Sequence, residues 1–152
     1  MIVGVISDTH GLLRPEAVAA LRDTDLIIHA GDIGNRDILD NLREIAPVFA
    51  VKGNVDTQPW ADKLPESLTM PIGAHKFHVL HMISELAIDP GKAGIAAVVF
   101  GHSHEPSIER RAGVLYLNPG SAGPRRFRLP VCLARVQVSD TCLEPEIVSL
   151  LA

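Results

Sequence analysis

Two histidines, His102 and His104, follow an apolar run that covers residues 95–100. A continuous apolar run of this length predicts a buried strand, so both imidazoles lie in the loop at the carboxyl end of that strand. Their spacing of two residues lets both rings face one polar centre. Such a pair is typical of a metal site when further ligands lie nearby.

Further polar side chains end the earlier predicted strands. In chain order they are Asp8, His10, Asp32, Asn54 and His81. Ligands of α/β sheets bind beyond the carboxyl ends of strands, so we expect these loops to converge with the histidine pair. Carboxylate oxygens and imidazole nitrogens suit Mn, Fe, Co, Ni or Zn better than Ca or Mg alone. The pattern predicts two metal ions for phosphoester hydrolysis, with Asp32 able to bridge them.

The elements that position these loops alternate between strand and helix in the first third of the chain. Strands are predicted at 2–7, 26–28 and 48–51, and helices at 16–22 and 35–45. Asn35 can cap the second helix, whose apolar residues form one stripe. This order favours a parallel sheet with right-handed crossovers.

The rest of the chain is predicted to be mainly strands. A hairpin at 68–72 and 76–80 places His75 in its turn and His81 at its exit. Beyond Glu105, strands are predicted at 107–110, 114–117, 130–138 and 143–149, and we expect antiparallel pairing there. The expected fold class is α/β, with two packed mixed β-sheets flanked by helices in one domain over residues 1–152.

Composition narrows the functional classes. The 152 residues are 47% hydrophobic with a net charge of −4, which disfavours nucleic-acid binding through a basic surface. No signal peptide is recognisable, and no apolar run reaches the roughly 20 residues of a membrane helix, so we expect a cytoplasmic protein without membrane contact. Cys132 and Cys142 are expected to be buried free thiols.

Together, these motifs resemble those of the calcineurin-like metallophosphoesterase family. They are Asp8-Thr9-His10, Gly31-Asp32, Gly53-Asn54, His81 and Gly101-His102-Ser103-His104. The short chain and the stretch Asn118-Pro119-Gly120-Ser121 resemble the small prokaryotic phosphodiesterase branch of that family. The resemblance implies a four-layer αββα sandwich, in agreement with the strand pattern.

The resemblance also implies individual roles. Asp8, His10 and His104 would bind the first metal ion, whereas Asn54, His81 and His102 would bind the second. Asp32 would bridge both ions opposite a hydroxide that attacks phosphorus, and Asp32, Asn54 and His102 are the expected catalytic residues. We expect Mn first, with Ni, Fe, Co or Zn as alternatives, and a small phosphodiester or phosphomonoester as substrate.

Two positions depart from the family pattern. Val55 stands where many members have a histidine that helps to protonate the leaving group, and valine cannot exchange a proton. This departure favours substrates with good leaving groups. Met82 follows His81 where glycine is frequent, which affects the local backbone rather than the imidazole.

Several alternatives stay open from the sequence. Because a eukaryotic sorting-complex subunit resembles the same branch, a non-catalytic protein-binding scaffold is the rival function, and homo-oligomerisation is open. Asp56 and His29 are candidates for contact with the ligands, with a structural role favoured for His29. Arg125 and Arg126 could meet a phosphate, although a solvated loop is the favoured interpretation.

Overall fold

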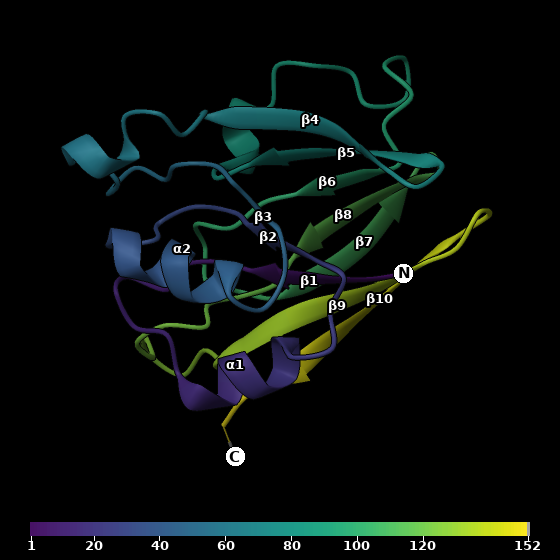
Figure 1. Ribbon diagram of the computed structural model, residues 1–152. Coiled ribbons are helices and arrows are strands. Elements are labelled where there is room, and N and C mark those ends of the chain that lie inside the picture. The colour runs from purple at the N-terminus through teal and green to yellow at the C-terminus, as the bar shows by residue number, and fades with distance from the viewer. Residues whose placement is uncertain (152) are drawn as a thin grey trace.

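A computed structural model describes residues 1–151 and contains two five-stranded sheets packed against each other (Figure 1). The first sheet has the order β10 (Leu143–Ser149), β9 (Cys132–Val138), β1 (Ile2–Ile6), β2 (Leu26–His29) and β3 (Val48–Ala50). Strands β1, β2 and β3 are parallel, and β9 is antiparallel to both β1 and β10. The predicted β-α-β-α-β order is therefore confirmed.

The second sheet has the order β4 (Ser67–Ile72), β5 (His75–Leu80), β6 (Ala97–Val99), β8 (Val114–Asn118) and β7 (Ser107–Arg111). The expectation of antiparallel pairing throughout the second half is wrong for β8, which is parallel to β6. The hairpin partner β7 takes the sheet edge, and β8 returns between β7 and β6. In this position β8 is antiparallel to β7 and runs in the same direction as β6.

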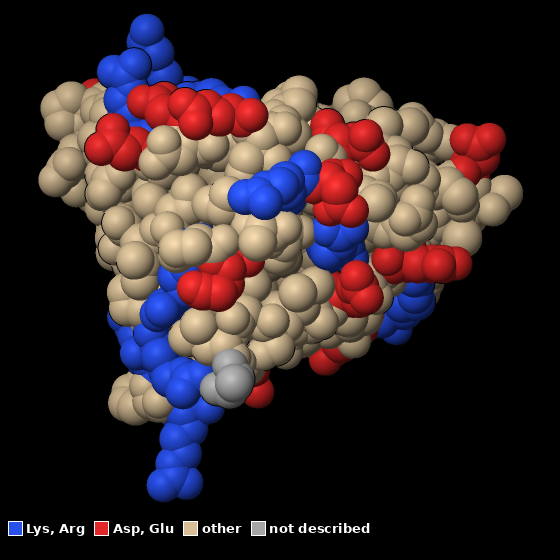
Figure 2. All heavy atoms as spheres, turned by 60° about the horizontal axis from the view of Figure 1, so that its bottom comes forward, with Lys and Arg blue, Asp and Glu red and all other residues tan. Residues whose placement is uncertain are grey.

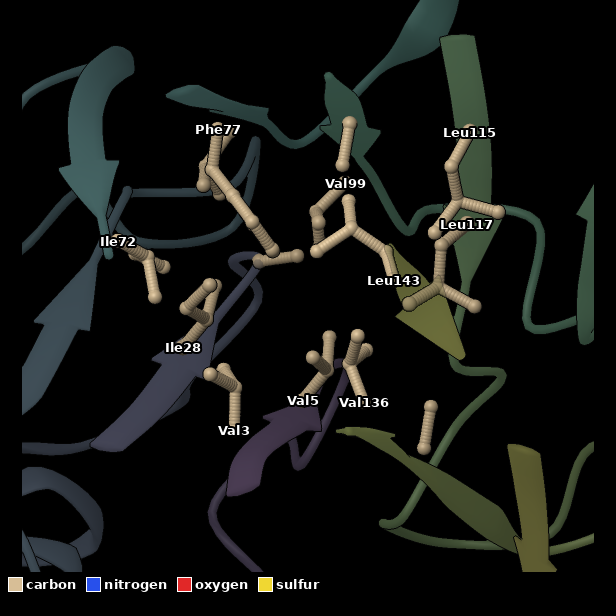
Figure 3. Packing of buried hydrophobic residues seen from close by; sticks show 14 of the residues in the cluster. Val3, Val5, Ile28, Ile72, Phe77, Val99, Leu115, Leu117, Val136 and Leu143 are labelled. Carbon is tan, nitrogen blue, oxygen red and sulfur yellow. The ribbon is translucent and has the colours of Figure 1, made fainter. Parts of the chain in front are cut away.

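Aliphatic side chains from both sheets fill the space between them. Figure 3 shows Val5 and Ile28 of the first sheet pointing toward Phe77 and Val99 of the second. All four are fully buried. Successive side chains of a strand point to opposite faces of its sheet. A shift of one residue in the pairing register would therefore turn these apolar side chains away from the space between the sheets.

The two α-helices cover the outer face of the first sheet. Helix α1 (Pro15–Leu21) buries Leu21 above Gly4, where a β-carbon would lie 2.4 Å from the leucine. Helix α2 (Arg36–Arg43) buries Ile38, Leu39 and Leu42, and Asn35 caps it by accepting the Ile38 N–H at 3.3 Å. The helices therefore fix the far ends of the loops that leave β1 and β2.

Residues 81–95 cover the outer face of the second sheet instead of an α-helix. Leu86, which follows the 3₁₀ turn η2 (Ile83–Glu85), and the buried Ile95 pack near Val98 and Val114. A second 3₁₀ turn, η1 (Pro59–Ala61), follows β3. Within residues 1–151, no helix has the length and apolar character needed to cross a membrane.

Charged side chains are spread over much of the surface. On the face in Figure 2, uncharged residues cover most of the area, acidic and basic side chains are scattered among them, and basic side chains gather at the lower corner. Of the two cysteines, Cys132 is buried and Cys142 is exposed, so the expectation of two buried thiols is wrong for Cys142. That residue lies in the turn between β9 and β10, beyond the sheet core.

Candidate metal centre

The loops after β1, β2, β5 and β6 bring six of the seven predicted metal ligands into two groups. One group contains Asp8, His10 and His104, and the other contains Asp32, His81 and His102. Within each group, one ligand atom from every residue lies within 4.8 Å of the others. The four histidines divide between the two groups as expected, whereas the role of Asn54 as a ligand stays a prediction.

The two groups share a centre. His10 Nε2 lies 3.7 Å from Asp8 Oδ1 and 3.6 Å from Asp32 Oδ2. His81 Nε2 lies 3.8 Å from Asp8 Oδ1 and 3.1 Å from Asp32 Oδ2. The carboxylates therefore stand between histidines of both groups, as a bridging ligand must.

Five of the ligand candidates adopt a left-handed backbone that is rare for residues other than glycine. Their φ angles are 56° for Asp8, 46° for His10, 54° for Asp32, 75° for His102 and 63° for His104. Strained backbone of this kind persists where the surroundings hold it, and it gathers at functional sites. The five residues therefore mark this centre as a functional site independently of their side-chain chemistry.

Two glycines make room for the carboxylates. A β-carbon on Gly53 would lie 2.1 Å from Asp32 Oδ1, and one on Gly101 would lie 2.6 Å from Asp8 Oδ2. Any larger residue would displace a carboxylate. The glycines of the Gly-Asn and Gly-His motifs are thus required by close packing at the centre.

The hydrogen bonds of His81 show how this centre fits a cation. Its Nδ1 lies 2.8 Å from the Ala30 carbonyl, so Nδ1 carries the proton and the Nε2 lone pair faces the carboxylates. Among the described residues, Asp8 Oδ1, His81 Nε2 and His104 Nδ1 are buried without a hydrogen-bond partner. Asp8 Oδ1 and His81 Nε2 lie 3.8 Å apart, and buried lone pairs this close repel one another unless a cation lies between them, so the donor set fits divalent metal ions.

The Asn118-Pro119-Gly120-Ser121 stretch braces the ligand loops. Asn118 Nδ2 donates to the Gly101 carbonyl at 3.2 Å and to Ser103 Oγ at 3.1 Å. Ser121 Oγ donates to the Asp8 carbonyl at 2.9 Å. The sequence identified this stretch only through the resemblance, and its structural role is to join the histidine loop to the Asp8 loop.

Asp56 holds the loops after β2 and β3 together. Its carboxylate accepts the N–H groups of Ile33 at 3.0 Å, Gly34 at 3.1 Å and Gly53 at 2.9 Å. These bonds use both oxygens and fix the segments on either side of Asp32. Asp56 therefore positions the loop that carries Asp32 through backbone N–H groups.

A buried histidine lies beneath both groups. Thr9 Oγ1 donates to the Ile33 carbonyl at 2.8 Å and therefore accepts from His29 Nε2 at 3.0 Å. His29 Nδ1 in turn accepts the Gly31 N–H at 3.1 Å. Burial lowers the pKa of His29 to about 4, so the ring is neutral and structural, as expected.

The carboxylates and imidazoles of the centre shift one another's pKa values. Burial is the largest single influence and raises the pKa values of Asp8 and Asp32, but hydrogen bonds and neighbouring histidines together outweigh it and lower both values, with His10 foremost for Asp8 and His81 foremost for Asp32. The pKa of His10 is raised chiefly by Asp8. For His81, Asp32 and Asp8 outweigh a lowering by burial, so its pKa is also raised. The carboxylates are thus ionised and ready to bind cations.

The remaining predicted residues lie around this centre or away from it. Asn54 is exposed and lines a cavity together with His81. Arg125 and Arg126 are exposed in the loop before β9, as expected for solvated arginines. His75 is not in the turn as expected, because it is the first residue of β5 and pairs with Ile72. Ser7, whose hydroxyl donates to Asp8 Oδ2 at 2.6 Å, carried no distinguishing signal in the sequence.

The sequence of this chain matches a family model and is similar to curated relatives that are named as phosphoesterases. A family model described as a calcineurin-like phosphoesterase superfamily domain matches residues 1–141. A probable metallophosphoesterase of Methanocaldococcus jannaschii is 35% identical over 92% of this chain and 77% of the relative. A phosphodiesterase of the same organism is 28% identical over 79% of this chain and 83% of its own length.

Solved structures agree on the fold. A novel archaeal phosphodiesterase superposes with a TM-score of 0.81 at 22% identity, covering 97% of this chain and 100% of that one. Vps29 from Entamoeba histolytica in complex with Zn²⁺ gives a TM-score of 0.77 at 23% identity, covering 99% and 100%. The predicted pair of packed mixed sheets is therefore the fold of both proteins.

Proposed function

The chain belongs to the calcineurin-like phosphoesterase superfamily, and from this premise we propose that it is a metal-dependent phosphodiesterase with a dinuclear centre. The observation that carries the proposal is the pair of three-residue groups around the shared carboxylates Asp8 and Asp32. The phosphodiesterase relative supports the choice of a diester. We propose Mn²⁺ as the first candidate metal.

The proposed ligands divide as the sequence predicts. Asp8, His10 and His104 would hold one cation, His81, His102 and Asn54 the other, and Asp32 both. Two divalent ions bound there would lower the pKa of water and polarise the oxygens of the substrate phosphate. The chain's own contribution is to hold the ligands before any ion arrives, through Ser7, Asn118 and Asp56.

Position 55 decides which diesters fit this chemistry. The Val55 side chain is exposed and has no proton to give, whereas its backbone N–H donates to Asp32 Oδ1 at 3.1 Å. Val55 therefore positions Asp32 without acting as an acid. We propose that turnover is fastest for diesters whose leaving group departs as a stable anion.

The test is hydrolysis of bis(p-nitrophenyl) phosphate by purified protein that is stripped of metal and then supplied with Mn²⁺, Ni²⁺, Co²⁺ or Zn²⁺. We expect turnover that requires metal and about two bound ions per chain. Circular dichroism of the same samples checks the fold. A folded protein that shows no turnover with any of these ions would contradict the proposal.

A protein-binding scaffold is the second candidate, because a valine replaces the family's acid and because Vps29 shares the fold. The same experiment separates the two functions. A scaffold would bind fewer than two ions or would hydrolyse nothing when loaded, whereas the enzyme combines both properties.

A further inference from the structure

A cavity of about 460 Å³ opens beside the second ligand group. It is lined by Asn54 and His81 at the metal centre, and by Lys52, Asp62, Glu66 and Glu85 farther out. Its volume lies in the range of small-molecule sites. A diester whose phosphate lies at the centre can therefore extend one of its ester groups into this space.

The charge of this cavity is unusual for a site that receives an anionic phosphate. Asp62, Glu66 and Glu85 are exposed, and no ion pair involves them within residues 1–151. Asp56 also lines the cavity, but backbone N–H groups occupy its oxygens. Three free carboxylates thus face one ammonium group, that of Lys52, and the cavity repels a second anionic group.

The inner end of the cavity is formed by a candidate ligand of the metal centre. His81 is 4% exposed and lines the cavity, and its Nε2 has no hydrogen-bond partner. The same atom lies 3.1 Å from Asp32 Oδ2, so the cavity is continuous with the ligand cluster. A ligand bound at the cluster is therefore adjacent to the carboxylates of the cavity.

We infer that this cavity selects a phosphodiester whose second ester group carries a positive charge, such as a quaternary ammonium or amino alcohol. The inference rests on the proposed function and adds the substrate class. In the reaction, the oxygen of water bonds to phosphorus, the bond to the leaving ester oxygen breaks, and the proton of water passes to that oxygen or to solvent. The cationic alcohol remains on the phosphate in the cavity.

Two chromogenic esters of equal shape test this inference with metal-loaded protein. One is p-nitrophenyl phosphocholine, and the other is its neohexyl analogue, in which carbon replaces the cationic nitrogen. We expect kcat/KM to be about fivefold higher for the choline ester, and we expect this ratio to fall as ionic strength rises. The combined variant Asp62→Asn, Glu66→Gln and Glu85→Gln should bring the ratio close to one.

A matched variant removes three exposed carboxylates elsewhere: Glu16→Gln, Asp140→Asn and Glu144→Gln. It should keep the wild-type ratio, which separates the cavity from net charge. Equal rates on both esters in the wild type, or an unchanged ratio in the cavity variant, would overturn this inference alone. No hydrolysis of either ester by folded, metal-loaded protein would overturn the proposed function as well.

Discussion

The two ligand groups of the centre use the same chemistry in different surroundings. Each combines one aspartate with two histidines. In the first group, His104 is buried and the side chain of His10 is 22% exposed. In the second, His81 is buried and His102 is exposed. Both groups thus present one enclosed and one accessible imidazole to their proposed ion.

The surroundings of the two groups have opposite charge. Arg126 lies on the side of the first group, where its positive charge opposes protonation of the histidines. The pKa of His10 is nevertheless raised, chiefly by Asp8, and the pKa of His104 is lowered chiefly by burial. The second group opens onto the cavity with Asp62, Glu66 and Glu85. The ligand types thus repeat between the two groups but the neighbouring charges do not, and under the proposal above this difference in charge would set which end of a substrate each side accepts.

Removing the residue that joins the groups should have the largest effect. Asp32→Asn replaces a carboxylate between His10 and His81 with a neutral amide. We expect kcat on an aryl diester to fall about 10³-fold or more, because both proposed ions lose a ligand. Steady-state kinetics at saturating Mn²⁺ measure this loss.

The control for this change is Asp40→Asn, which removes an exposed carboxylate from α2. It should leave kcat within a factor of about two of the wild type, because a surface ion pair contributes little. If Asp32→Asn kept wild-type activity, the two groups would not share a bridging carboxylate.

Single histidine changes should separate the groups. His10→Ala and His102→Ala each remove one ligand from one group, and we expect bound metal to fall from about two ions per chain to about one in both variants. Activity should fall by about 10² in each. Metal analysis after gel filtration gives the count, and His75→Ala, at the far end of β5, is the control. Two ions retained in His102→Ala would remove that residue from the second group.

The braces of the groups should matter less than the ligands. Gly34 N–H donates to Asp56 Oδ1 and Gly53 N–H donates to Oδ2, so Asp56→Asn places an NH₂ donor against one of these N–H groups and should cost activity about 10-fold to 100-fold. Asn118→Ala removes both hydrogen bonds that Asn118 Nδ2 donates to the histidine loop, and it should lower activity by a similar factor. Kinetics over a range of metal concentrations should show weaker metal affinity in both variants. Unchanged metal affinity would limit these residues to a role in stability.

The strand-end positions of the candidate ligands could be predicted from the sequence, whereas the hydrogen bonds that brace them could not. Asp8, Asp32 and His102 each follow an apolar run, and strand ends are where ligands of such sheets gather. The bond from Ser121 to the Asp8 carbonyl spans 113 residues, and no local pattern encodes it. The parallel direction of β8 was missed for a related reason, since chain order indicates hairpins and not insertion between strands.

The cavity carboxylates were also beyond the sequence. They come from irregular segments after β3 and β5, where spacing carries no periodic signal. Only the packing of η1 and η2 near the second group brings them to one opening. The charge difference between the two sides of the centre therefore depends on which segments meet in the folded chain, and the local sequence does not reveal it.

The smallest effect concerns the residue that both groups share beneath the centre. His29 binds Thr9 beside the first group and Gly31 beside the second. Its pKa is about 4 in the folded chain, compared with an ordinary value of 6.5, so between these values the unfolded chain binds the extra proton. The contribution of His29 to the free energy of unfolding is therefore fully present above pH 6.5 and is lost as the pH falls toward 4. Between pH 7 and pH 5, the free energy of unfolding should fall by about 2 kcal/mol through His29.

Urea denaturation in EDTA measures this loss without a contribution from bound metal. His10 and His81, whose pKa values are raised, act in the opposite direction, so the contribution of His29 is read as a difference between wild type and His29→Gln. Glutamine keeps one donor and one acceptor but cannot be protonated, and His29→Asn serves if the glutamine variant does not fold. We expect the wild type to lose about 2 kcal/mol more than the variant over this pH interval. Equal losses would mean that His29 is protonated in the folded chain and that it does not join the two groups as a neutral ring.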